Sequence, residues 1–75
     1  MSAESETQRA LGAAIKGARE RADMLQKELA HESGLDITYV CSVERGKRNL
    51  TIASLLKISK ALGVLPSTLL KRAGA

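Results

Sequence analysis

The chain has 75 residues, of which 44% are hydrophobic and 27% are charged, and its formal net charge is +4 at pH 7. This length allows one small domain with a single core and leaves little room for the deep pocket of an enzyme. The balance of apolar and charged residues excludes a disordered chain. One aromatic residue and one proline are present, which favours a helical domain over a β-sandwich or barrel.

Individual residue types exclude further classes of protein. Cys41 is the single cysteine, so no internal disulfide forms, and Cys41 and His31 lack the spacing of a zinc site. No hydrophobic run approaches the ~20 residues that span a bilayer, and the first six residues are too polar and acidic for a signal peptide. No serine is paired in sequence with a histidine base. We therefore expect a cytoplasmic helical domain without catalytic residues, metal, cofactor, small-molecule substrate or membrane association.

Residues 1–6 are expected to form a flexible tail, and residues 7–73 a single domain of five short helices. Ser5 or Thr7 caps the first helix, which ends near residue 22 or 23 and whose apolar residues recur at intervals of three or four: Leu11, Ile15, Ala18 and Ala22. Two glycines interrupt this helix, Gly12 and Gly17. Each costs up to ~1 kcal/mol relative to alanine unless close packing uses the missing side chain.

The next two helices are delimited by glycines and by a polar cap. The second helix begins around Gln26 and stops at Gly34, which suits the left-handed conformation found after helices. Asp36 caps the third helix, which runs to about Glu44 and is ended by Gly46.

The last two helices are equally short. Thr51 caps the fourth helix, Gly63 stops it, and its inward face is expected to hold Ile52, Leu55, Leu56, Ser59 and Leu62. Pro66 suits the first turn of the fifth helix, which contains Leu69 and Leu70.

The second and third helices have the pattern of a helix-turn-helix. They are joined by Gly34-Leu35-Asp36, and Ala30 is small enough for two crossing helices to approach closely. If Val40 and Val43 point into the core, Thr38, Ser42 and Arg45 point outward, with Tyr39 and Cys41 on the flanks. A polar outer face followed by a basic loop is what insertion into the DNA major groove requires.

Four segments, taken in order, resemble the phage repressor/Cro-type helix-turn-helix regulators of the Xre family. They are Gln-Lys-Glu-Leu-Ala at 26–30, Gly-Leu-Asp at 34–36, Thr-Tyr-Val at 38–40 and Val-Glu-Arg-Gly-Lys-Arg-Asn at 43–49. The resemblance runs from about Leu11 to Leu70, and the segments between 35 and 52 are more similar still to the controller proteins of restriction–modification systems. It implies a compact, all-α, five-helix domain with a lambda-repressor-like DNA-binding fold, from a prokaryote or a phage.

The resemblance also implies a role for individual residues. Base edges are contacted by Ile37, Thr38, Cys41 and Ser42. The DNA backbone is contacted by Gln26, Tyr39, Arg45, Lys47, Arg48 and Asn49, although Tyr39 is equally suited to packing at the rim of the core. Arg19 and Glu44 form a structural ion pair between the first helix and the end of the third.

Two residues depart from the family pattern. Ile37 stands where relatives often have arginine or glutamine, and an isoleucine side chain can contact a thymine methyl group but cannot hydrogen-bond to a base. Cys41 replaces a common serine, and the absence of a second cysteine for a disulfide makes a spectator thiol the favoured interpretation over a redox sensor. The operator sequence is therefore not transferable from a relative.

Two classes of function fit the sequence. The first is a sequence-specific transcriptional regulator that binds double-stranded DNA as a homodimer on a near-palindromic operator, by occlusion or by recruitment of RNA polymerase. Its dimer interface is expected on the last two helices, at Ile58, Val64, Leu65, Leu69 and Leu70. The second is an antitoxin-like protein-interaction module whose DNA binding is autoregulatory. The helices occupy nearly all of the chain, which favours the first class. The sequence leaves open the operator, the direction of regulation, the regulated genes and the pairing of dimers.

Overall fold

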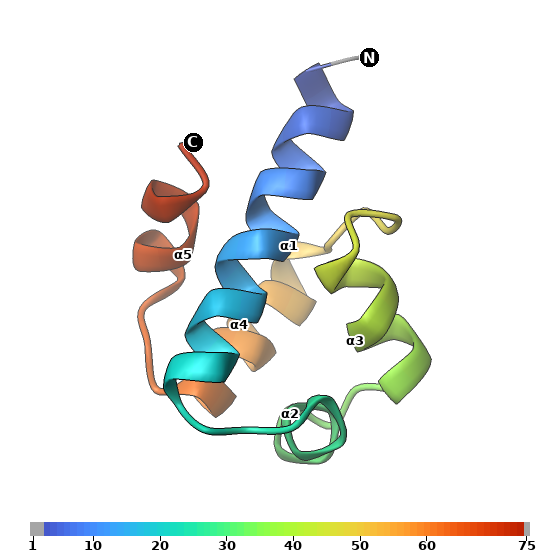
Figure 1. The fold of residues 1–75 in the computed structure, drawn as a ribbon, viewed down its shortest axis with the longest axis vertical. Helices are drawn as coiled ribbons and strands as arrows, with labels where there is room; N and C mark the ends of the chain where they lie inside the picture. Colours follow the sequence, from blue (N-terminus) through green and yellow to red (C-terminus); the bar gives the residue numbers. More distant parts are fainter. Residues whose placement is uncertain (1–2, 75) are drawn as a thin grey trace.

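The computed structural model describes residues 3–74, and in this range the chain forms five α-helices and no β-strand (Figure 1). The helices are α1 (Ala3–Arg21), α2 (Gln26–Ser33), α3 (Ile37–Glu44), α4 (Ile52–Leu62) and α5 (Pro66–Arg72). The predicted all-α fold class is confirmed.

Short-range signals fix the ends of α2, α3 and α4 where the sequence predicts them. The side chain of Asp36 accepts a hydrogen bond from the backbone N–H of Thr38 at 2.8 Å, and that of Thr51 accepts one from Ser54 at 3.0 Å. Gly34 and Gly63 follow α2 and α4 with φ of 72° and 71°, a conformation that costs other residues energy.

α1 begins earlier than the sequence predicts. The helix already includes Ser5 and Thr7, so neither residue caps it, and residues 3–6 of the expected flexible tail are helical. No proline or glycine interrupts this segment, and the acidic Glu6 is favourable near a helix N-terminus. Residues 1 and 2 of the expected tail lie outside the described residues.

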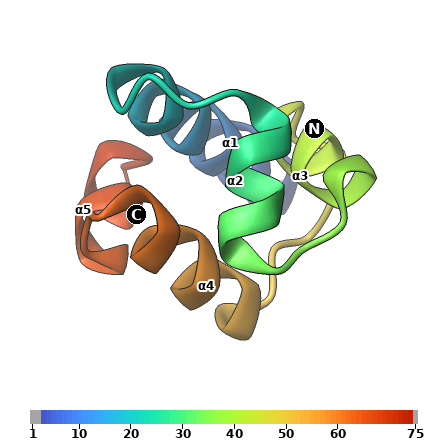
Figure 2. The ribbon, with the colours of Figure 1, turned by 90° about the horizontal axis from the view of Figure 1, so that it is seen from below.

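One hydrophobic core is shared by all five helices. α1 packs against α3, α4 and α5, while α2 packs against α3 and α4. Figure 1 shows α1 between α3 and α5, and Figure 2 shows α2 between α3 and α4. The core consists of Leu11, Ile15, Ala18, Leu29, Ala30, Val40, Val43, Leu55, Ile58, Leu62 and Leu69.

Three residues that the apolar pattern assigns to this core lie outside it. Ala22 is exposed because α1 ends at Arg21. Ile52 is 76% exposed at the first position of α4, and Leu56 is 51% exposed because it is turned by about 100° from the buried Leu55. The inward face of α4 is centred on Ile58 instead.

No single helix of residues 3–74 is long and apolar enough to cross a bilayer. α4 and α5 meet the length and composition only when taken together across a bend of 101°, and their residues Ile58 and Leu69 are completely buried in the core.

Gly12 is the position at which α1 crosses the end of α3. A Cβ atom there would lie 2.2 Å from the carbonyl oxygen of Val43 and 3.0 Å from that of Glu44. At Gly17 a Cβ would meet the flexible side chain of Arg21, at 3.3 Å. The close crossing of α1 and α3 therefore depends on the absence of a side chain at Gly12. At Gly17 the packing does not require a glycine.

Candidate nucleic-acid interface

A buried ion pair fixes α3 relative to α1. Nε of Arg19 donates to Oε2 of Glu44 at 2.7 Å, and its Nη2 donates to Oε1 of the same carboxylate at 3.1 Å. Nη1 of Arg19 donates to the backbone oxygen of Met24 at 2.8 Å, which ties in the turn before α2. The Glu44 side chain is only 2% exposed. Its hydrogen bond and charge raise the pKa of Arg19 against the opposing effect of burial, so the guanidinium stays protonated.

Gln26 extends this network to α2 and to the flank of α3. Its Nε2 donates to Oε1 of Glu44 at 3.0 Å, and its Oε1 accepts a hydrogen bond from Sγ of Cys41 at 3.3 Å. Because both ends of its amide are engaged, Gln26 ties the start of α2 to the second half of α3. One N–H of its amide is left for an outside acceptor such as a phosphate. The half-buried Cys41 thiol points at α2 rather than straight outward.

The outer face of α3 is open to solvent at its first turn. Ile37 and Thr38 are exposed, and Ser42 is half-buried one turn further along. The apolar side of the same helix is closed, because Val40 and Val43 are buried in the core. The orientation predicted from these two valines is confirmed.

A basic loop follows α3 directly. Its polar side chains are all exposed: Arg45, Lys47, Arg48 and Asn49. The guanidinium of Arg48 lies over the ring of Tyr39, 5.4 Å from the ring centroid, in a cation–π contact. Tyr39 is half-buried, and its hydroxyl oxygen is enclosed without a hydrogen-bond partner in the described part of the chain. The Tyr39 ring therefore packs at the rim of the core, and through Arg48 it also connects α3 to the loop.

The loop also rests on the first turns of α1, a contact that the sequence pattern does not reveal. Nε2 of Gln8 donates a hydrogen bond to Oδ1 of Asn49. Gly46 has a φ of 73°, and a Cβ atom added to it would lie 2.8 Å from the Cα of Arg9. Local spacing carries no signal for these contacts, because Gln8 and Asn49 are 41 positions apart.

The five residues expected at a dimer interface do not share one exposed surface. Ile58 and Leu69 are completely buried, which corrects their assignment, because the core of the monomer leaves them no surface for a second copy. Val64 and Leu70 are partly buried against the core, and Leu65 is 68% exposed between α4 and α5.

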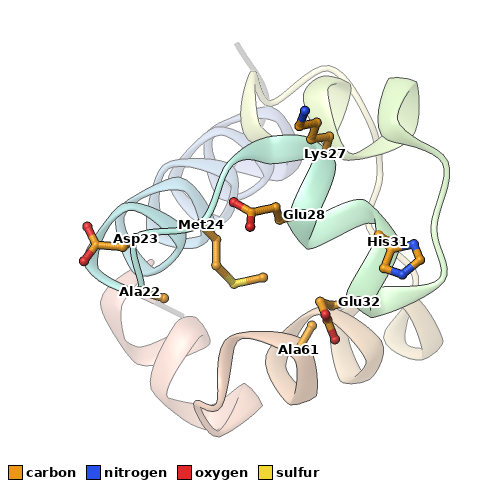
Figure 3. Close-up of a pocket in the computed structure, with 8 residues that line it drawn as sticks. All are labelled: Ala22, Asp23, Met24, Lys27, Glu28, His31, Glu32 and Ala61. Carbon is orange, nitrogen blue, oxygen red and sulfur yellow. The ribbon is translucent and has the colours of Figure 1, made fainter.

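A separate groove lies on the other side of α2, between the α1–α2 turn and α4 (Figure 3). Its volume is about 630 Å³, and its lining consists of Ala22, Asp23, Met24, Lys27, Glu28, His31, Glu32 and Ala61. Oε1 of Glu28 is engaged by the backbone N–H of Leu25 at 2.8 Å, which stabilises the start of α2. Among residues 3–74 no three metal-ligating side chains come together, here or elsewhere.

Comparison with known proteins identifies the class to which this fold and surface belong. A helix-turn-helix family profile matches residues 15–69, which includes all of α2, α3 and α4. Control protein C.BamHI of Bacillus amyloliquefaciens is 48% identical over 50 residues, which are 67% of this chain and 62% of that protein. Control protein C.SmaI of Serratia marcescens is 40% identical over 60 residues, or 80% of this chain and 71% of that protein.

A solved structure agrees with these sequence matches. The restriction–modification controller protein C.AhdI from Aeromonas hydrophila superposes with a TM-score of 0.81 at 37% sequence identity, covering 83% of this chain and 94% of that one. The chain therefore belongs to the helix-turn-helix family of DNA-binding regulators and, within it, to the restriction–modification controller proteins.

Proposed function

We propose that this protein is a sequence-specific transcriptional regulator that binds a near-palindromic operator as a homodimer and controls a restriction–modification system. The observation that carries the proposal is the exposed first turn of α3 beside a loop with three basic side chains, Arg45, Lys47 and Arg48. A helix of this kind fits the major groove, and cations beside it neutralise phosphates. The similarity to control proteins of restriction–modification systems supports the regulatory role.

The outer face of α3 is the reading face, which contacts the bases. On it Thr38 and Ser42 supply hydroxyl groups that donate hydrogen bonds to base edges or accept them. Ile37, exposed at the first helical position, supplies an apolar contact for a thymine methyl group. Cys41 contributes a base contact at the flank of α3, where its thiol also donates a hydrogen bond to Gln26. With few strong donors on this face, phosphate contacts and groove shape carry much of the binding energy.

The phosphate contacts come from both sides of α3. Gln26 offers its remaining N–H, and Tyr39 supports Arg48 from beneath. Arg45, Lys47, Arg48 and Asn49 lie along the DNA backbone and set the height of α3 in the groove. A protein of this kind acts on DNA in the cytoplasm and has no catalytic role.

In the homodimer the two α3 helices lie about 34 Å apart, which is one turn of the duplex and the spacing that a near-palindromic site requires. We assign its interface to Leu65 and to the partly buried Val64 and Leu70 around it, on the α4–α5 side. The position of the operator relative to the promoter decides between occlusion and recruitment of RNA polymerase.

The mass of the protein in solution tests the dimer, with two leucine-to-glutamate variants of equal charge. Leu65→Glu is expected to give monomers. It is also expected to weaken operator binding, because each monomer then binds a single half-site independently. Leu25→Glu alters another exposed leucine, 58% exposed just before α2, and is expected to leave the dimer intact. A dimeric Leu65→Glu protein would contradict the assigned interface, and a monomeric wild-type protein on DNA would contradict the homodimer.

A further inference from the structure

The basic loop after α3 is held against α1 at both of its ends. At one end Gly46 packs against the backbone of Arg9 so closely that no side chain fits between them. The backbone N–H of Lys47 donates to the carbonyl oxygen of Ser42 at 2.9 Å, which fixes the direction in which the loop leaves α3. At the other end Gln8 is bonded to Asn49. The first turns of α1 therefore act as the support on which the loop rests.

The bond between Gln8 and Asn49 has a direction, and that direction has a chemical consequence. Nε2 of Gln8 donates and Oδ1 of Asn49 accepts, so the acceptor end of the Asn49 amide is turned toward α1. The donor end is left for an outside group, because Asn49 is exposed and its Nδ2 has no partner within residues 3–74. A phosphate oxygen only accepts hydrogen bonds, so it requires this orientation of the amide and is repelled by the opposite one.

We propose that Gln8 is a positioning residue for DNA binding: it orients the Asn49 amide so that its N–H groups face the phosphate backbone. This role rests on the proposed function, since it requires Asn49 to contact DNA. Gln8 lies before the region matched by the helix-turn-helix family profile, which begins at residue 15, so it extends the interface to a part of α1 outside the shared motif. Gln8 and Arg9, the residues that contact the loop, both lie in the second turn of α1.

A double-mutant cycle on operator affinity tests the proposal. Gln8→Ala is expected to weaken binding by about threefold to tenfold, the usual range for one hydrogen bond. In an Asn49→Ala background the same substitution is expected to have no further effect, because the group that it orients is gone. Thr7→Ala, an exposed neighbour on the same helix, serves as the matched control and is expected to bind like the wild type. The slope of affinity against salt is expected to stay unchanged, since both residues are neutral.

The direction of the bond is tested by a second pair of variants with equal charge. Gln8→Glu can only accept a hydrogen bond, so it turns the Asn49 amide around and presents its oxygen to the phosphate. It is expected to lose more affinity than Thr7→Glu, which adds the same charge one position away. Equal losses in this pair would overturn the orienting role.

The outcomes separate this proposal from the proposed function. If Gln8→Ala lowers the thermal midpoint and weakens binding equally in both Asn49 backgrounds, its role is structural and the proposal is overturned, while a wild-type protein that still selects an operator keeps its function as a regulator. An Asn49→Ala protein that binds the operator like the wild type would likewise overturn the proposal for Gln8 and leave the proposed function standing. A wild-type protein that binds no DNA would overturn both, whereas one that binds DNA without preference for any sequence would overturn the proposed function alone.

Discussion

Replacing Gly12 by alanine is expected to destabilise the domain, although alanine is the better helix former. The added Cβ would fall 2.2 Å from the carbonyl oxygen of Val43 and 3.0 Å from that of Glu44. Both are backbone atoms at the end of α3, so relief requires α1 and α3 to move apart. Overpacking a core costs about 3 kcal/mol at the upper end of its usual range, and the gain in helix propensity is about 1 kcal/mol. The expected net loss is therefore about 2 kcal/mol.

Chemical and thermal unfolding followed by far-UV circular dichroism measures this loss, with Gly17→Ala as the matched control. For a domain of this size a loss of 2 kcal/mol corresponds to a thermal midpoint lowered by roughly 10 °C. At Gly17 the added Cβ meets only the far end of the Arg21 side chain at 3.3 Å, which can move aside. Gly17→Ala is therefore expected to raise stability by about 0.5–1 kcal/mol. A Gly12→Ala protein at least as stable as the wild type would refute the close crossing of α1 and α3.

Three further substitutions test the ion pair and the DNA contacts. Glu44→Gln leaves the charge of Arg19 buried without its carboxylate and is expected to cost about 3 kcal/mol in urea unfolding; a loss below about 1 kcal/mol would contradict a structural role. Arg48→Ala is expected to weaken binding to all DNA sequences and to lower the salt slope by about one unit, and an unchanged slope would remove Arg48 from the interface. Thr38→Ala is expected to alter the preferred base at one or two positions of the selected site, whereas an identical selection profile would count against base contact.

The ends of the helices from α2 onward could be predicted because each depends on one residue with a short-range effect. Gly34 and Gly63 adopt the left-handed conformation that stops a helix, while Asp36 and Thr51 bond to backbone N–H groups two or three residues ahead. The start of α1 could not be predicted from caps. Ser5 is also tolerated inside a first helical turn, so a residue that is able to cap a helix need not be the one that begins it.

The reading face of the candidate site could be predicted from the two valines that turn α3 toward the core. The supporting contacts could not, because Gln8 meets Asn49 only after α1 and α3 have crossed. The expected dimer surface failed in part for a related reason. An apolar residue such as Ile58 is either core or interface, and the choice depends on how α4 packs rather than on its sequence.

Selection of binding sites from random duplex DNA, followed by affinity measurements across salt concentrations, tests whether the protein recognises a specific DNA sequence as a dimer. We predict recovery of one near-palindromic site with half-site centres about 34 Å apart, bound by two chains at least about a thousandfold more tightly than random DNA. Salt-sensitive binding without an enriched site would contradict sequence-specific regulation by this protein. It would mean that the basic loop attracts DNA while α3 distinguishes no sequence.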